Sequence, residues 1–205
     1  MSEGLRERKM RLTRRRMEQA AVDLAYENGI QSVTVDQICE AAMVSRSTFF
    51  NYFPSLDDAI FGPPLTYDPA LTERLLTKYS DALVIAASLI VTETLRGQLD
   101  DDIAQRRLAL LSREPGATTA VSWSSDESRE GLVDVVAAWL DDHREFAKIP
   151  DIDSMAEAQM IVALCISLGE EAIPQLIEEG GRLIVDEDAY RRAYRRLGQL
   201  LGVAD

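Results

Sequence analysis

The spacing of apolar residues along the chain predicts helices from one end to the other. Near the N-terminus, one apolar stripe follows helical spacing at Met17, Ala20, Ala21, Leu24 and Ala25. Asn28-Gly29 then forms a typical helix end. Similar stripes recur to the C-terminus, and no segment sustains the apolar–polar alternation of a strand. We therefore predict an all-α fold.

Residues 34–53 predict two short helices joined by a tight turn. Thr34 and Gln37 have the spacing of a capping box, and Ser45 suits the first position of a second capped helix. Phe49 and Phe53 are four residues apart and can pack inward on one face. The side chains left to face outward are those of Arg46, Ser47, Thr48, Phe50, Asn51 and Tyr52.

The outward face of the second helix is typical of a helix that enters a DNA groove. Helix-turn-helix proteins place the start of their second helix against base edges. Arg46 can bond a guanine, and Asn51 an adenine or a phosphate. Hydroxyl groups suit phosphate oxygens, which fix register rather than sequence, and are carried here by Ser45, Ser47, Thr48 and Tyr52. An ordinary core hairpin is the alternative, but it would not need so polar and so well capped a second helix.

Residues 10–60 resemble the DNA-binding domain of the TetR family of bacterial repressors. The resemblance rests on Glu27-Asn28-Gly29, Val33-Thr34-Val35, Ile38, Ala41-Ala42, and the run from Val44 through Phe53 to Pro54-Ser55. It implies a three-helix DNA-binding domain over residues 1–60. It also implies a larger helical domain over residues 61–205 that binds a ligand and forms a dimer. The candidate DNA-contacting residues are Thr34, Ser45, Arg46, Ser47, Thr48, Phe50, Asn51, Tyr52 and, from the basic N-terminal segment, Arg14.

Three positions depart from the pattern of that family. Met43 replaces the usual turn glycine, so we expect a left-handed backbone there at some energetic cost. Phe50 replaces a tyrosine and loses its hydroxyl, and Leu56 replaces a lysine that touches a phosphate. The last two changes affect individual phosphate contacts and leave the mode of binding intact.

The charge distribution is compatible with DNA binding although the net charge is −13. Residues 1–17 hold seven basic and two acidic residues, whereas residues 61–205 carry a net charge of −12. Positive charge is thus concentrated where DNA contact is expected, and the acidic remainder would be repelled by phosphate. We interpret the basic segment as an arm that touches the DNA backbone or minor groove, with a solvated leader as the alternative.

Beyond residue 53 the pattern predicts a series of further helices. A short helix after Ser55 should end near Gly62-Pro63-Pro64, where the TetR family tends to have a longer helix. The other expected helices span 68–79, 80–97, 103–112, 115–143 with an interruption near 122–128, 154–179 with a kink or end at Pro174, and the segment containing Tyr190 to Leu201.

The last two predicted helices are candidates for a subunit interface. In the TetR family such a pair packs against its copy as a four-helix bundle. A two-fold DNA site also requires a two-fold protein, so we expect a homodimer through these helices. The alternative is that they only complete the core of a single chain.

No set of residues predicts catalysis, a metal site or a bound cofactor. His143 lies beside Asp141 and Asp142, but adjacent helical side chains do not converge on one ion. Gly180-Gly181 reads as a turn, because no phosphate-binding lysine follows. Cys39 and Cys165 are expected as buried thiols, and the absence of a signal peptide or apolar span favours a cytoplasmic protein.

The family resemblance implies a small-molecule effector inside the C-terminal domain. The candidate pocket residues are Phe61, Tyr79, Trp123, Trp139, Met155, Met160 and Cys165, each of which could equally be plain core. The two tryptophans suit an apolar ligand with a polar tip. Residues 106–115 are similar to members that sense acyl chains or acyl-CoA, which gives a hypothesis for the ligand class.

These observations predict a dimeric, ligand-responsive repressor that leaves a palindromic double-stranded operator when a small, largely apolar effector binds. A transcriptional activator or a ligand-independent DNA-binding protein shares the first 60 residues and is the alternative. A helical enzyme or protein-interaction module that merely carries a helix-turn-helix is the more distant rival, because no catalytic set is visible.

Overall fold

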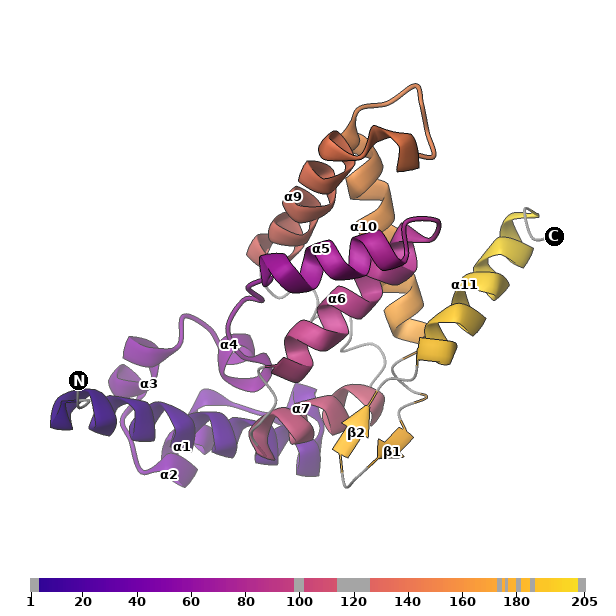
Figure 1. Ribbon diagram of the computed structural model, residues 1–205. Coiled ribbons are helices and arrows are strands. Elements are labelled where there is room, and N and C mark those ends of the chain that lie inside the picture. Colours follow the sequence, from indigo (N-terminus) through magenta and orange to yellow (C-terminus); the bar gives the residue numbers. More distant parts are fainter. Residues whose placement is uncertain are drawn as a thin grey trace. The chain divides into compact units, whose positions relative to one another are not determined.

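The computed structural model describes residues 4–97, 102–113, 126–172, 175, 177–179, 182–184 and 187–202 (Figure 1). The chain forms two compact units. The first comprises Met1–Pro63 and Asp101–Leu110, and the second comprises Pro64–Asp100 and Leu111–Asp205. The first unit therefore contains a segment that follows much of the second in the sequence.

The N-terminal part of the first unit is built on a long helix. Its elements are α1 (Leu5–Asn28), the 3-10 turn η1 (Ile30–Ser32), α2 (Val35–Ala42), α3 (Arg46–Tyr52) and α4 (Leu56–Phe61). α1 packs against α2 and α4. The core between them consists of fully buried side chains, among them Met17, Ile38, Phe49, Phe53 and Ile60. The apolar stripe predicted on α1 faces this core at Met17, Ala21 and Ala25.

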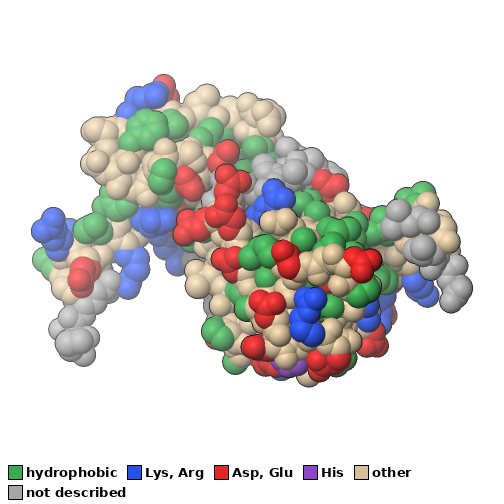
Figure 2. Space-filling view, turned by 90° about the horizontal axis from the view of Figure 1, so that it is seen from above, with side chains coloured by type: hydrophobic (Ala, Val, Ile, Leu, Met, Phe, Trp, Pro, Cys, Tyr) green, Lys and Arg blue, Asp and Glu red, His purple; other side chains and the backbone are tan. Residues whose placement is uncertain are grey.

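The basic N-terminal segment is the first part of α1 and not a separate arm. Residues 5–17 are helical, and the side chains of residues 5–12 are exposed. Figure 2 shows Lys and Arg side chains gathered there, next to the grey N-terminal residues. Arginine and lysine are good helix formers, so the helix continues beyond the apolar stripe that packs against the core.

Helix α7 (Asp102–Arg113) contributes its residues up to Leu110 to the first unit. Arg107 donates from Nε to the carbonyl oxygen of Ile60 over 2.7 Å, and from Nη2 to that of Ala59 over 3.2 Å. These carbonyls belong to the last turn of α4, where backbone acceptors lack partners within the helix. Arg106 forms an ion pair with Asp23 of α1. α7 thus ties both ends of the unit together.

The second unit is a helical bundle around α10 (Figure 1). α10 packs against α9 and α6, and also against α11, while α5 covers α6. The helices of this unit are α5 (Pro69–Lys78), α6 (Leu83–Gly97), α9 (Asp126–Asp142), the 3-10 turn η2 (Arg144–Phe146), α10 (Ser154–Ala172) and α11 (Glu187–Leu201). Their shared core includes Leu76, Ile90, Leu132, Leu140 and Leu168.

The helical architecture is confirmed, with one addition. β1 (Ile177–Glu179) and β2 (Arg182–Ile184) form an antiparallel hairpin in which Ile177 pairs with Ile184. The prediction that the helix starting at Ser154 extends to residue 179 is therefore wrong. α10 ends at Ala172, two residues before Pro174, as expected where proline removes a backbone donor and restricts the residue before it.

The other predicted boundaries agree closely with the structure. α4 ends before Gly62, which has a φ of 94°, and α5 begins at Pro69 after its cap Asp68. α9 begins at Asp126; the predicted helix start at Pro115 and the predicted turn at Gly180-Gly181 lie outside the described residues. Among the described helices, none is both long and apolar enough to cross a bilayer.

Candidate nucleic-acid interface

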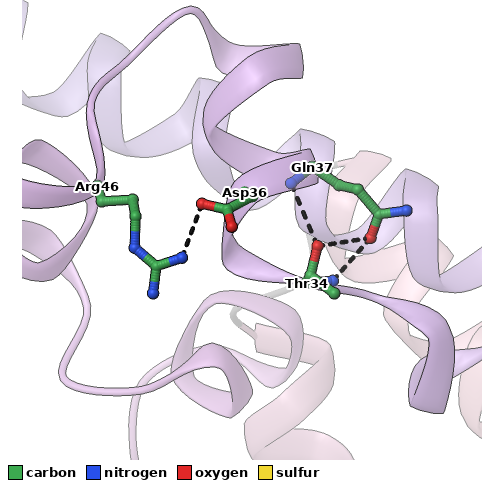
Figure 3. Close-up of polar contacts among 4 residues, drawn as sticks. All are labelled: Thr34, Asp36, Gln37 and Arg46. Atoms are coloured by element: carbon green, nitrogen blue, oxygen red, sulfur yellow. Dashed lines mark hydrogen bonds and ion pairs between the residues drawn. The ribbon is translucent and has the colours of Figure 1, made fainter.

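The first helix of the motif is held at its start by a capping box. The backbone N–H of Gln37 donates to Oγ1 of Thr34 over 3.3 Å, and the backbone N–H of Thr34 donates to Oε1 of Gln37 over 2.8 Å (Figure 3). Each residue thereby satisfies a donor that the helix itself leaves free. Thr34 is exposed, but its side chain is already engaged in this cap.

The turn of the motif passes through Met43 in a left-handed conformation. Its φ and ψ are 55° and 49°, and it is the non-glycine residue with positive φ in the described part of the chain. The backbone N–H of Val44 donates to the carbonyl of Cys39 over 2.9 Å, which closes the end of α2. The expectation of a left-handed backbone at Met43 is confirmed. Its side chain is 85% exposed and contributes little packing to offset the strain.

The second helix, α3, is capped by Ser45 and anchored by phenylalanines. Oγ of Ser45 accepts the backbone N–H of Thr48 over 3.1 Å and lies 2.9 Å from the hydroxyls of both Ser47 and Thr48. Phe49 and Phe53 are fully buried with ring centroids 5.3 Å apart. The predicted inward face is confirmed. Because these rings fix the rotation of α3, the remaining side chains are directed outward.

The outward face of α3 is accessible as the sequence predicts. Arg46, Ser47 and Asn51 are exposed, while Thr48 and Tyr52 are half-buried. Phe50 is 50% exposed and meets Phe49 edge to face. The structure therefore leaves the base-reading positions of a helix-turn-helix open to solvent.

Arg14 of α1 lies next to the C-terminal end of α3. Its guanidinium carbon is 4.9 Å from the centre of the Phe53 ring, and its Nε forms an ion pair with Glu18 over 3.0 Å. Phe53 is the residue that ends α3. α1 therefore places a positive charge beside the C-terminal end of α3.

Sequence reasoning missed one residue on this surface. Asp36, in the first turn of α2, accepts a hydrogen bond from Nη1 of Arg46 over 2.7 Å (Figure 3). The two residues are ten positions apart, and both side chains are largely exposed, at 70% for Asp36 and 59% for Arg46. Their spacing carries no helical periodicity, so the contact depends on how the turn at Met43 folds α3 back toward α2.

The residues predicted for a ligand pocket do not gather in one place. Tyr79, Trp139 and Cys165 are buried in the second unit, where burial raises the pKa of the Cys165 thiol to about 11. Phe61 is buried in the first unit. Met155 and Met160 are 42% and 51% exposed on α10, because α10 turns its other face to α6 and α9. Trp123 lies outside the described residues.

The second unit nevertheless contains buried polar atoms that lack partners among the described residues. Nε1 of Trp139 and Oγ1 of Thr94 are in this state. The indole ring of Trp139 stacks on His143, with centroids 4.4 Å apart, and on Phe146 at 5.6 Å. Nδ1 of His143 lies 3.0 Å from the carbonyl oxygen of Trp139. His143 therefore closes the end of α9, and in the described ranges no three His, Cys, Asp or Glu side chains gather as a metal site.

The basis for an acyl-CoA ligand is weakened by the position of α7. Arg106 pairs with Asp23, and Arg107 donates to the end of α4, so both side chains serve the first unit. Arginines that are already bonded in this way are poorly placed to hold the phosphates of an acyl-CoA.

Comparison with known proteins agrees with the geometry of the motif. A family model described as bacterial regulatory proteins, tetR family, matches residues 19–58, which include α2 and α3. The HTH-type transcriptional regulator TcmR of Streptomyces glaucescens is 28% identical over 174 residues, which is 81% of this chain and 74% of that protein.

The fold itself is similar to that of a solved regulator. The crystal structure of NalD, the secondary repressor of the MexAB-OprM multidrug efflux pump in Pseudomonas aeruginosa, superposes with a TM-score of 0.54. It is 18% identical and covers 94% of this chain and 96% of its own, so the likeness concerns the fold. Residues 19–58 are thus similar to the DNA-binding domain of the tetR family of bacterial regulatory proteins, with the helix-turn-helix formed by α2 and α3.

Proposed function

We propose that the protein is a ligand-responsive repressor that binds a pseudo-palindromic operator as a homodimer. The observation that carries the DNA-binding assignment is the outward face of α3, where Arg46, Phe50 and Asn51 are exposed while Phe49 and Phe53 lock the helix in place. A rigid helix with exposed polar side chains at its start is what major-groove recognition requires.

Each exposed group on the motif has a role in this proposal. Arg46 bonds a guanine, Asn51 bonds an adenine or a phosphate, and Phe50 contacts a thymine methyl. The hydroxyls of Ser47, Thr48 and Tyr52, together with Arg14, contact phosphates and set the register. Ser45 and Thr34 act mainly as caps, because their side chains are engaged at the starts of α3 and α2.

The proposed dimer interface lies on α10 and α11. Met155, Met160 and Ala163 are exposed along α10, and Tyr194 and Leu200 are exposed on α11. Burying such apolar groups stabilises an association by about 25 cal/mol for each square ångström removed from water. Two copies joined in this way present two α3 helices to successive major grooves.

The proposed effector is a small, largely apolar molecule with a polar group. Nε1 of Trp139 and Oγ1 of Thr94 are buried and have no partner among the described residues, so they can supply polar contacts to such a ligand. Leaving such an atom unsatisfied costs about 1–3 kcal/mol, so a ligand atom that bonds it is favoured. The effector would act by binding more tightly to the conformer that does not fit the operator.

The first test is selection of duplexes from a random DNA library by the full-length protein. We expect an enriched two-fold symmetric site, and binding to it, measured by gel shift, that weakens as salt increases. Arg46→Ala should weaken binding by about 1–3 kcal/mol and relax preference at one position, whereas Tyr52→Phe should weaken all duplexes alike. No enrichment, or an unchanged preference in the Arg46 variant, would contradict the assignment of the reader.

The regulatory direction is tested separately by transcription in vitro from a promoter that carries the selected site. We expect the protein to lower transcript yield and a small apolar effector, found by thermal shift, to restore it. A rise in yield on adding the protein would indicate an activator. Release from DNA by no compound in the screen would favour a ligand-independent regulator.

A further inference from the structure

The ion pair between Asp36 and Arg46 occupies an unusual place for both residues. Arg46 is the first residue of α3, so its positive charge lies at the positive end of a helix dipole. Asp36 is a carboxylate on a face that, in the proposed function, approaches phosphates. Asp36 itself is favoured in the first turn of α2, so the 2.7 Å contact offsets the unfavourable position of Arg46 and places a negative charge beside the proposed reader.

The contact contributes little to folding. Exposed ion pairs contribute only marginally to the free energy of unfolding, because solvent screens them and two side chains lose freedom. Both side chains here are more than half exposed. The pair therefore matters mainly because it restricts the side chain of Arg46.

The guanidinium of Arg46 is restricted on two sides. Nη1 donates to Oδ1 of Asp36, and the guanidinium carbon lies 6.0 Å from the centre of the Phe50 ring, at the edge of the range for a cation–π contact. A guanidinium has five N–H donors in a fixed plane. With Nη1 held by Asp36, the edge formed by Nε and Nη2 remains for a partner (Figure 3).

We propose that Asp36 is a specificity-determining residue that holds Arg46 so that its Nε and Nη2 edge meets a guanine. That edge can bond O6 and N7 of guanine together. The proposal rests on the proposed function, in which α3 reads the operator and Arg46 is the reader. A side chain that is already fixed loses less conformational entropy when DNA binds. The binding free energy improves only where the base matches the Nε and Nη2 edge.

Asp36 should also weaken binding to DNA of any sequence. Its carboxylate is repelled by backbone phosphates whatever the base sequence. The two effects together predict that Asp36 weakens binding to unrelated DNA and widens the gap between the preferred site and its variants. A residue that merely adds negative charge would do the first and not the second.

The experiment uses full-length protein and a duplex selected from random DNA, with three further duplexes in which the guanine at the Arg46-dependent position is replaced. Asp36→Ala, Arg46→Ala and the double variant are compared by gel shift at one salt concentration. Glu40→Ala is the matched control, because Glu40 is an exposed carboxylate four residues further along α2. Thermal unfolding of each variant checks that the fold is retained.

We expect Asp36→Ala to reduce discrimination between the guanine duplex and its variants by about three- to tenfold, while binding to unrelated DNA is unchanged or tighter. Glu40→Ala should leave discrimination unchanged. In the Arg46→Ala background, removing Asp36 should have no further effect on discrimination, because the residue acts through Arg46.

Three results would overturn the proposal. Asp36→Ala could behave like Glu40→Ala, in which case Asp36 is only a repelling charge. It could reduce discrimination equally in the Arg46→Ala background, in which case Asp36 contacts a base directly. If Arg46→Ala itself leaves discrimination intact, the reader assignment in the proposed function fails as well, which distinguishes that failure from a failure of Asp36 alone.

Discussion

At the scale of single residues, Met43 shows how a family position can change its amino acid and keep its backbone. The turn between α2 and α3 needs a left-handed residue, and Met43 adopts that conformation with φ at 55°. A side chain in that region costs about 1–2 kcal/mol relative to the right-handed region. The motif therefore imposes a left-handed backbone on Met43, although methionine itself favours the right-handed region.

Met43→Gly is expected to raise the free energy of unfolding by about 0.5–1 kcal/mol. Glycine removes the strain at positive φ, although it also gains freedom in the unfolded chain, which offsets part of the benefit. Urea unfolding followed by circular dichroism measures the change. Met43→Ala is the control, since it keeps a Cβ and should give no comparable gain. A glycine variant no more stable than the alanine variant would show that the turn is unstrained.

Phe50 is a second residue where one atom, the hydroxyl oxygen that tyrosine would add, should change DNA binding. Phe50→Tyr restores the hydroxyl that the TetR family usually has here, at a side chain that is already 50% exposed. We expect tighter binding to all duplexes by about 0.5–1.5 kcal/mol, with unchanged sequence preference, because the new bond goes to a phosphate. Gel shifts on selected and unrelated duplexes measure this. A gain restricted to one base position would instead mean that the ring reads sequence.

At the scale of elements, the sequence predicts the helix-turn-helix because its caps and its phenylalanine pair lie within a few residues of each other. The contacts between elements depend on residues that are far apart in the chain. The caps at Thr34 and Ser45 and the pair Phe49 and Phe53 act within four residues, so their pattern is readable from the sequence. The pairing of Asp36 with Arg46 depends on the angle of the turn. The exposed side of Met160 depends on which face of α10 packs against its neighbours.

The hairpin after α10 was missed for a similar reason. Its strands are three residues each, too short for alternation to stand out. Pro174, two residues after Ala172, correctly predicts the end of the helix, but it carries no information about what comes after.

The contact of α7 with the end of α4 could not be predicted from the sequence, because no periodicity links residues so far apart. Arg107→Met keeps most of the side-chain volume and removes the donors to the carbonyls of Ala59 and Ile60. We expect a loss of about 1–2 kcal/mol in the free energy of unfolding, because a charged donor to a helix end is lost from a half-buried site. Urea unfolding checks this.

Arg113→Met is the control for Arg107→Met, since Arg113 is an exposed arginine at the C-terminal end of the same helix, outside the first unit. Equal and small effects of the two substitutions would show that the end of α4 does not depend on Arg107. A larger effect of Arg107→Met on unfolding, with the circular dichroism of the folded protein unchanged, would agree with a capping role.

At the scale of the whole molecule, the charge distribution favours DNA contact through the first unit, and the exposed apolar side chains of the second unit suit the proposed dimer. The basic residues near the N-terminus are concentrated on α1, while residues 61–205 carry a net charge of −12. The negative charge of residues 61–205 is repelled by DNA phosphates, so binding to DNA should depend on the motif. The exposed apolar side chains on α10 and α11 are then available for a second copy.

Met160→Glu is expected to weaken the proposed dimer, because a carboxylate would replace a methionine in an apolar interface. Burial of an unpaired charge costs several kcal/mol, so sedimentation should show a shift toward monomer at micromolar concentration. Binding to a two-fold site should weaken in parallel. Ala138→Glu, at an exposed position of α9, is the control. A dimer that is unaffected by Met160→Glu would place the interface elsewhere.

The discontinuous first unit has a consequence for how the protein is made. Arg107 lies 47 residues after Ile60, so the ribosome must extend the chain through α5 and α6 before the end of α4 receives its donor. At about 5–20 residues per second, this interval lasts roughly 2–10 seconds. During that time a nascent chain holds α1 to α4 without α7. The first unit can therefore be completed only when about half of the 205 residues have been made, after α5 and α6 of the second unit have left the ribosome.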